Sequence, residues 1–529
     1  MPAQLERALD ALKGHTALRA LRRGIEKESL RVTPDGSLSQ TPHPRGLGAA
    51  LTHPHITTDF SEAQLELITD VHESAAACIG ELEDIHRFVY RNLPDELMWT
   101  ASMPCLLGAE SDIPVGRYGT SNVGRSKTIY RLGLGHRYGR LMQTISGIHY
   151  NFSLPDALWP VVAKSRGERS GNLTGGTMAG QTATATDAYF DLIRNFRRTS
   201  WLLLYLFGAS PAVCKSFARD QPHHLQSLDE GTLYLPYATS LRMGGLGYQS
   251  DAQSSLHVSY NSLADYSASM QEALTKPYPP YEQMGVKVDD EYRQLNAALL
   301  QIENEFYGTI RPKRRTHPGE RPLAALHARG VEYVEVRCMD LNPFLRVGID
   351  VHAMRFLDIF LLHCLLSASP PDSRTESEEM LANQHSVVET GREPDLHLER
   401  NGNAVAMADW ATTILSECDA IAETIDEVAG NDDHTYAVEL QRQKIAQPAL
   451  TPSARLLESM RLQRVPFFRF AMSQSAAHKG YFEENPLRAA RLLEFERMTE
   501  KSIEDQAKIE ASDTESFDEY LARYLAINP

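Results

Sequence analysis

The stretch RGIEKESLRV (residues 23–32) decides the fold, because it alternates acids with other residues in the manner of a strand. Successive side chains of a strand point to opposite faces, so Glu26 and Glu28 share a face with Leu30 and Val32. For an isolated pair of acids the usual explanation is a solvated strand end, since charged residues are mostly exposed. Whether this pair does more depends on the rest of the chain.

The overall composition is that of a folded globular protein, since 42% of the 529 residues are hydrophobic and 23% are charged. A net charge of -16 argues against nucleic-acid or anionic-membrane partners, because both need a cationic surface. The first 15 residues predict an amphipathic helix rather than a secretory signal. Two apolar stretches, 201–214 and 356–368, are too short to span a bilayer and predict buried helices. We expect a cytoplasmic protein.

Cysteine usage gives no sign of a metal or redox motif. The six cysteines lie far apart and form no C-x-x-C pair. We therefore expect reduced thiols at positions 78, 105, 214, 338, 364 and 418.

The hydrophobic pattern predicts a mixed α and β fold. Strand-like alternation occurs at 24–32, 64–69, 144–154 and 331–339. Helical periodicity occurs at 79–92, 186–207 and 290–302. Because the strands are far apart in the sequence, they predict a central sheet assembled from distant segments.

Composition shifts divide the chain. A stretch rich in glycine, serine and threonine predicts a mobile surface loop at about 164–186. A proline- and serine-rich segment at 367–380 marks the end of the sheet region, and the pattern beyond it is helical and charge-rich. We expect a core of sheet and helices at 1–366 that carries the chemistry, and a mainly helical region at 367–529 packed on it.

A second strand, EYVEVR (residues 332–337), repeats the alternation and places Glu335 and Arg337 on one face. By itself this is most simply a surface ion pair on the wet face of a sheet. The strand at 149–154 places His149 on one of its faces. Together these strands favour a sheet with one chemically active face.

If these strands lie in one sheet that forms the floor of a cavity, a set of acids converges there: Glu26, Glu28, Asp59, Glu66 and Glu335. Such a cluster is costly unless cations neutralise it. Mg²⁺ prefers carboxylate oxygens and usually shares its shell with substrate phosphates, so the cluster predicts a nucleotide as readily as a metal. Arginine suits phosphate and carboxylate groups because its planar fork can donate two parallel hydrogen bonds. The available basic residues are Arg242, Arg311, Lys313, Arg314, Arg315 and Arg337.

Two common nucleotide signatures are missing. GTSNVGRS (residues 119–126) nearly fits a P-loop, but Arg125 replaces the required lysine and no buried strand precedes it. No G-x-G-x-x-G follows a strand either, so a Rossmann site is unsupported. A nucleotide would have to be bound by another design.

With these residues in hand, the sequence resembles the proteobacterial type of the glutamate–cysteine ligase (γ-glutamylcysteine synthetase) family. The segments that carry the resemblance span residues 23 to about 345: RGIEKESLRV, LTHPHITTDFSEAQLELIT, MWTASMPC, YGTSNVGRSKTIYRLGL, MQTISGIHYNFS, YLFGASPAVC, YLPYATSLRMGGLGY, QIENEFYGTIRPKR and GVEYVEVRCMDLNPF. The C-terminal third resembles the family only loosely.

The resemblance implies an α+β fold similar to that of glutamine synthetase, with a curved, mainly antiparallel sheet, surrounding helices and a helical C-terminal region. It also implies the reaction: ATP phosphorylates the γ-carboxylate of L-glutamate, and the amine of L-cysteine displaces phosphate to give γ-glutamylcysteine, the first step of glutathione synthesis. The implied cofactor is Mg²⁺, or Mn²⁺ in its place, with ATP as co-substrate. A monomer, and feedback by glutathione, are further expectations.

The family's roles carry over residue by residue. The implied metal ligands are Glu26, Glu28, Asp59, Glu66, His149 and Glu335. Glu335 and Arg337 are the implied catalytic residues, with Arg337 stabilising the transferred phosphoryl group, and Arg242 is implied to bind a substrate carboxylate. The implied walls of the cysteine pocket are Phe60, Tyr130, Arg131, Leu134, Gln143, Ile145, Tyr248 and Tyr307.

One departure from the family and two alternative functions follow from the sequence. Cys105 lies in the family's MPC element, but no cysteine occurs near residue 163, where some relatives have one, so we expect no disulfide at Cys105. One alternative is a ligase of the same fold that joins glutamate to a different amine. The other is a non-catalytic metal- or nucleotide-binding relative, although none of the implied acids is missing.

Overall fold

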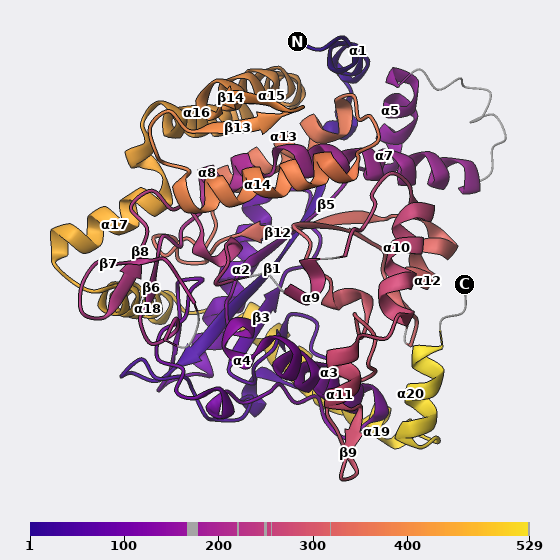
Figure 1. Cartoon of the computed structure of the whole chain (residues 1–529), viewed down its shortest axis with the longest axis vertical. Coiled ribbons are helices and arrows are strands. Elements are labelled where there is room, and N and C mark those ends of the chain that lie inside the picture. The colour runs from indigo at the N-terminus through magenta and orange to yellow at the C-terminus, as the bar shows by residue number, and fades with distance from the viewer. Residues whose placement is uncertain (167–177, 220–221, 248–250, 255, 318, 527–529) are drawn as a thin grey trace.

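The computed structural model describes residues 1–166, 178–219, 222–247, 251–254, 256–317 and 319–526 (Figure 1). Within these ranges a seven-stranded sheet has the order β11-β12-β5-β1-β3-β2, and β4 pairs with one end of β1. All of its pairings are antiparallel. Its strands are β1 (Arg22–Val32), β2 (Ile56–Thr58), β3 (Gln64–Ile68), β4 (Leu97–Met98), β5 (Ile148–Ser153), β11 (Ile310–Lys313) and β12 (Tyr333–Met339). The predicted sheet of distant segments is confirmed.

Shorter strands and many helices surround this sheet. The short strands are β6 (Ala212–Cys214), β7 (Gln226–Ser227), β8 (Thr232–Tyr234), β9 (Lys287–Val288), β10 (Glu291–Tyr292), β13 (His397–Arg400) and β14 (Asn403–Ala406). The helices before residue 367 are α1 (Ala3–Leu12), α2 (Ala75–Arg91), α3 (Asn122–Tyr138), α4 (Arg140–Gln143), α5 (Trp159–Ser165), α7 (Met178–Thr199), α8 (Trp201–Phe207), α9 (Asp251–Ser254), α10 (Leu263–Thr275), α11 (Pro279–Met284), α12 (Pro322–Arg329) and α13 (Val351–Leu366). The later helices are α14 (Arg374–Thr390), α15 (Met407–Ala429), α16 (Asp433–Ala446), α17 (Pro452–Gln463), α18 (Phe467–Glu484), α19 (Ala489–Ser512) and α20 (Phe517–Leu525).

The sheet has one apolar face, which forms the main core with α7 and α13. In Figure 1 these helices lie with α15 and α16 at the top of the molecule, above the sheet. Ile25 of β1 and Val334 of β12 are fully buried in this core. A polar group is buried here too: Asp358 of α13 pairs with Arg23 at 2.8 Å and accepts a hydrogen bond of 2.6 Å from the hydroxyl of Tyr150. The opposite face is left to the polar residues of the same strands.

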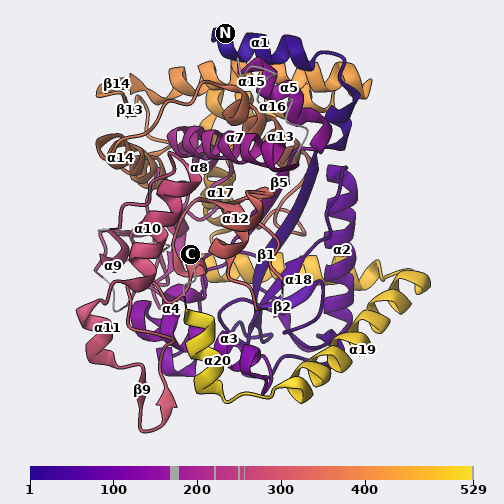
Figure 2. The ribbon, with the colours of Figure 1, turned by 90° about the vertical axis from the view of Figure 1, so that its right-hand side faces the viewer.

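The C-terminal helices return to the sheet region. Figure 2 shows α20 beside α3, at the end of the long helix α19. Phe517 and Leu521 of α20 pack with Ile129 of α3 in a small apolar cluster. Asp513 accepts a hydrogen bond of 2.6 Å from the backbone amide of Asn122, the first residue of α3. The C-terminal end thus supports the outer side of α3, while the division into 1–366 and 367–529 stays a prediction.

Most of the predicted helices are confirmed, but two helix predictions and one loop prediction need correction. The predicted helix at 290–302 is wrong, because side chains there bind backbone groups in place of a helical ladder: Gln301 accepts from the amide of Leu295, and Asn296 donates to the carbonyl of Gln301. The predicted buried helix at 201–214 ends at Phe207, since residues 212–214 form β6.

The third correction concerns the predicted loop at 164–186. Residues 178–186 already belong to α7, so the predicted loop is too long. Residues 167–177 lie outside the described part of the chain, and the mobility of the loop stays a prediction.

The expectation of reduced thiols is wrong for one pair, because Cys105 and Cys214 form a disulfide. Sequence spacing gave no hint of it, since 109 residues separate the two cysteines, yet the fold places their Cα atoms 5.2 Å apart. The other cysteines, Cys78, Cys338, Cys364 and Cys418, are free and buried. Among the described residues, no helix combines the length and the apolar character that crossing a bilayer needs.

Candidate active site

A cavity of about 240 Å³ lies over the polar face of the sheet. Most of the residues singled out from the sequence line it: Glu26, Asp59, Phe60, Glu66, Tyr130, Arg131, Leu134, Gln143, His149, Tyr307, Arg311, Lys313, Glu335 and Arg337. The strand order brings them together, because directly opposed residues of antiparallel strands share a face. In this register Glu26 opposes His149, Glu28 opposes Glu66, and Arg311 opposes Glu335.

His149 stands at the centre of the acid cluster. Its Nδ1 lies 3.4 Å from Glu26 Oε2 and 3.7 Å from Glu335 Oε1, and its Nε2 lies 3.5 Å from Glu28 Oε1. Potential ligand atoms of Glu26, His149 and Glu335 all lie within 4.8 Å of one another. The predicted convergence of distant acids on one site is therefore present in the structure.

Repulsion between like charges opposes ionisation of two acids in the cluster, Glu66 and Glu28. Burial raises the pKa of Glu66 well above its usual range, and the negative charges of Glu26, Asp59 and Glu28 raise it further. Burial and the charge of Asp59 also raise the pKa of Glu28. These carboxylates are therefore costly to ionise together without added cations.

The donor set fits a divalent cation. Glu28 Oε1 and His149 Nε2 are both buried, and neither makes a hydrogen bond to any of the described residues. Buried polar atoms without a hydrogen bond are costly, and these two lie 3.5 Å apart, so one cation between them could satisfy both. Carboxylate oxygens with one imidazole suit Mg²⁺ or Mn²⁺.

Cations line the side of the cavity formed by β11 and β12. Lys313 Nζ lies 3.3 Å from Glu335 Oε1, and Arg337 donates to Glu335 Oε2 at 3.5 Å. Burial opposes ionisation of Glu335, but the positive charges of Lys313 and Arg337 outweigh it and hold the pKa of Glu335 well below its usual range. Arg311 is nearly buried and donates to the backbone carbonyl of Asn304 at 2.8 Å.

Helix α3 supplies one wall of the cavity. Its N-terminus is capped by Ser121, whose hydroxyl accepts from the amide of Gly124 at 3.2 Å, and the helix then carries Tyr130, Arg131 and Leu134 to the cavity. Arg131 donates to the backbone carbonyl of Asp59. Gln143 of α4, the short helix that follows α3, donates to the hydroxyl of Tyr307 at 2.7 Å. The predicted pocket residues therefore meet from several distant segments.

Among the described residues, three of the predicted site do not line the cavity: Glu28, Arg242 and Ile145. Glu28 is 1% exposed and accepts a hydrogen bond of 2.7 Å from the amide of Gly147. Arg242 is 0% exposed; it donates to the carbonyl of Arg337 at 3.0 Å and lies 3.9 Å from Asp340. Ile145 is buried, and Tyr248 lies outside the described residues. The roles of Arg242, Ile145 and Tyr248 in substrate binding stay predictions.

The cavity also contains residues that the sequence reasoning missed, Lys127, Asn304 and Glu305. Glu305 is 1% exposed and accepts hydrogen bonds of 2.8 Å from Arg137, 2.7 Å from Tyr138 and 2.6 Å from the amide of Gln301. The signal for it was present in QIENEFY, an acidic segment between apolar residues.

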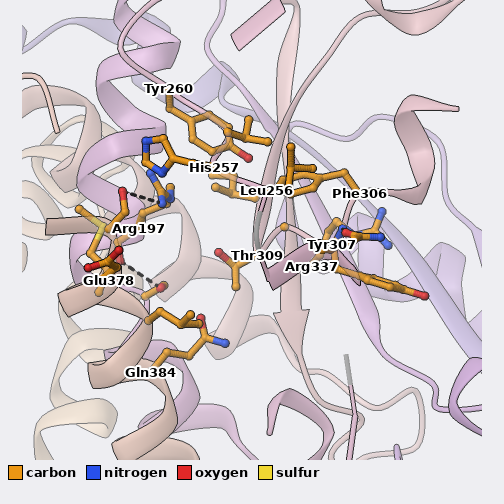
Figure 3. Close-up of a pocket in the computed structure, with 18 of the residues that line it drawn as sticks. Arg197, Leu256, His257, Tyr260, Phe306, Tyr307, Thr309, Arg337, Glu378 and Gln384 are labelled. Carbon is orange, nitrogen blue, oxygen red and sulfur yellow. Dashed lines mark hydrogen bonds between the residues drawn. The ribbon is translucent and has the colours of Figure 1, made fainter. Parts of the chain in front are cut away.

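A second cavity of about 290 Å³ adjoins the first and shares Tyr307 and Arg337 with it. In Figure 3, these two residues stand at one side, while Glu378 and Gln384 of α14 stand at the other. Much of the lining is apolar, with Leu256, Val258, Tyr260, Phe306 and Ile310 among its residues. Arg337 therefore lies between an apolar cavity and the acid cluster.

Comparisons with known proteins agree on one family. The family model described as "Glutamate-cysteine ligase" matches residues 7–387. The chain is 49% identical to a glutamate–cysteine ligase of Alcanivorax borkumensis, over 98% of this chain and 99% of that protein. It is 50% identical to one of Azotobacter vinelandii, over 98% and 97%. The crystal structure of glutamate–cysteine ligase from Francisella tularensis in complex with AMP matches with a TM-score of 0.89 and 36% identity, covering 96% of this chain and 97% of that one.

Proposed function

Because the chain belongs to the glutamate–cysteine ligase family, we propose that the cavity over the acid cluster is its active site. The reaction is the ATP-dependent joining of the γ-carboxylate of L-glutamate to the amine of L-cysteine. Its product, γ-glutamylcysteine, is formed in the first step of glutathione synthesis. The observation that carries the proposal is the close cluster of Glu26, His149 and Glu335 beside Arg337.

The chemistry explains why such a site needs both signs of charge. A carboxylate is a poor electrophile until it is phosphorylated, and phosphoryl transfer depends mostly on positioning and charge neutralisation. Mg²⁺ held by Glu26, Glu28, Asp59, Glu66, His149 and Glu335 would neutralise phosphate charge and polarise the group being transferred. Arg337 lines both cavities, which supports a role for it in stabilising the transferred phosphoryl group.

The second cavity is the proposed place of the adenosine part of ATP. Its apolar lining suits a purine ring, and a nucleotide seated there would direct its phosphates past Arg337 toward the acid cluster. The AMP in the Francisella tularensis structure supports an adenine nucleotide as a ligand of this family.

The cysteine pocket is proposed on the α3 side of the first cavity. Tyr130, Leu134 and Phe60 provide apolar surface there, and Gln143 and Tyr307 provide polar groups. The carboxylate role of Arg242 and the parts of Ile145 and Tyr248 belong to this proposal as well. Mn²⁺ as a substitute metal, feedback by glutathione, a monomeric state and a cytoplasmic location complete it, on the resemblance to the family alone.

The test is ADP release by the purified protein with Mg-ATP and L-glutamate against a panel of amines that includes L-cysteine. We expect release that depends on cysteine, with γ-glutamylcysteine identified by mass. Release with another amine would retain the site and change the substrate, and no release with any amine would refute the proposal.

A further inference from the structure

Lys313 occupies an unusual position, because its amine contacts a carboxylate oxygen that the metal would also need. The amine lies 3.3 Å from Glu335 Oε1. The same oxygen lies 3.7 Å from His149 Nδ1 and therefore faces the centre of the acid cluster. Within the described part of the chain, Glu335 is the hydrogen-bond partner of this amine.

We propose that Lys313 has two partners in turn: it neutralises Glu335 while the metal site is empty, and it binds a phosphate oxygen of the nucleotide once a divalent cation takes Glu335. Lys313 would then be a catalytic residue that also sets the order in which metal and nucleotide bind. The inference rests on the proposed function, because the phosphate that Lys313 would bind belongs to the ATP of that reaction.

The first half of the proposal follows from charge. A divalent cation bound to Glu335 Oε1 would stand close to the ammonium group that already occupies that oxygen, and two cations repel each other. Glu335 Oε2 remains with Arg337 at 3.5 Å, so the exchange affects one oxygen only. Lys313 must move before the metal can bind there at full strength.

The second half follows from the chemistry of the lysine side chain and from its surroundings. Lysine is a compact charge on a flexible stem with three donors, and it suits phosphate oxygens. The side chain of Lys313 is 26% exposed, whereas that of its neighbour Arg311 is nearly buried and tied to the backbone carbonyls of Asn304 and Phe306. The Lys313 side chain is therefore freer to change its partner than the Arg311 side chain, which two backbone carbonyls hold in place.

The other charges around Lys313 agree with an exchange. Glu26 and Glu335 attract the ammonium group, and Arg311 repels it. Once the acids are satisfied by a metal, the attraction falls while the repulsion from Arg311 remains. The phosphates of a nucleotide are then the nearest anions that the proposed function supplies.

The test is direct titration of Mn²⁺ in the absence of nucleotide, read by electron paramagnetic resonance, on wild type, Lys313→Met and Lys313→Arg. We expect Lys313→Met to bind Mn²⁺ about tenfold more tightly than wild type does. A like charge next to an ionic site weakens the binding of a cation there by about tenfold or more, and the variant removes that charge. The same variant should bind ATP more weakly in the presence of metal. Lys313→Arg should keep wild-type Mn²⁺ affinity, and Lys127→Met controls for loss of another lysine of the cavity.

Unchanged or weaker Mn²⁺ binding by Lys313→Met would overturn the proposal, because it would mean that Lys313 supports Glu335 instead of competing for it. Circular dichroism shows whether the variant is folded, and Lys313→Gln replaces it if it is not. These readings do not require turnover. Normal metal exchange with no ADP release would therefore refute the proposed reaction and leave the competition for Glu335 intact.

Discussion

Replacing Glu66 by glutamine should make the metal-free protein more stable and abolish its activity. Glu66 of β3 opposes Glu28 of β1, so the two side chains start about 5 Å apart. The negative charges near Glu66 also include those of Glu26 and Asp59, and the positive charge of Arg131 attracts the Glu66 carboxylate. Glutamine has nearly the same shape and removes the charge, so the substitution isolates the cost of packing these acids together.

The size of the effect follows from Coulomb's law. Two charges about 5 Å apart at an effective dielectric constant of about 20 repel by roughly 3 kcal/mol. Arg131 offsets part of this repulsion. We therefore expect a gain of about 1 to 3 kcal/mol in the free energy of unfolding at pH 8 with chelator present, which for a chain of this length raises the melting temperature by about 1 to 3 °C.

The pH dependence has a fixed sign. The pKa of Glu66 is raised in the folded state, so the native protein holds this proton more tightly than the unfolded chain does. The stability that this contributes is present below the ordinary glutamate pKa and is lost as the pH rises through the raised one. The advantage of Glu66→Gln should accordingly be large at pH 8 and vanish near pH 4.

Chemical denaturation at both pH values checks this prediction, with Glu73→Gln, an exposed acid just after β3, as the matched control. Added Mg²⁺ should stabilise the wild-type protein by about 2.7 kcal/mol when its concentration is 100 times the Kd of the protein for Mg²⁺. It should stabilise Glu66→Gln by less. A variant less stable than wild type at pH 8 without metal would show that the acids are not in conflict.

Three further substitutions test other parts of the structure. Glu335→Gln should abolish ADP release while circular dichroism shows an intact fold; wild-type-like turnover would contradict the metal assignment. Gly147→Ala should lower both stability and activity, because a Cβ at this position would overlap the guanidinium of Arg242, and an unchanged melting curve would show that Arg242 can give way. Tyr150→Phe should cost about 1 to 3 kcal/mol of stability, since it leaves Asp358 with one buried partner fewer, and KM for both amino acids should stay at the wild-type value.

Much of the fold could be predicted because its signals are local. The alternation in β1 and β12 identified both strands, and it also identified the faces that carry Glu26 and Glu335. The order of the strands has no such local signal. The convergence of His149 with these acids could therefore only be predicted by assuming one common sheet, or from the resemblance to a family.

The wrong or missing predictions share a physical cause: contacts between residues distant in the sequence decide these features, and the local sequence pattern does not show such contacts. The periodicity at 290–302 predicts a helix, but glutamine and asparagine side chains bind the backbone groups that a helix would pair. The disulfide between Cys105 and Cys214 depends on where the segment after β4 lies relative to β6, which spacing in the sequence cannot show. Glu305 was missed for the same reason, because its importance lies in distant partners such as Arg137.

The order of the strands also explains how one sheet face can hold both the anionic phosphates and the metal cations of the proposed function. Cations stand on β11 and β12, and acids stand on β1 and β3, so the face is positive at one side and negative at the other. In the proposed function, the phosphates of the nucleotide would meet Lys313 of β11 and Arg337 of β12, and metal cations would lie on the side of Glu66. Glu335 lies at the boundary, paired with both cations and within reach of His149. In the proposed function, a phosphoryl group passing from ATP to glutamate would cross that boundary, where the carboxylate of Glu335 is shared between Lys313 and Arg337, and this is why the proposed exchange of partners is placed at Lys313.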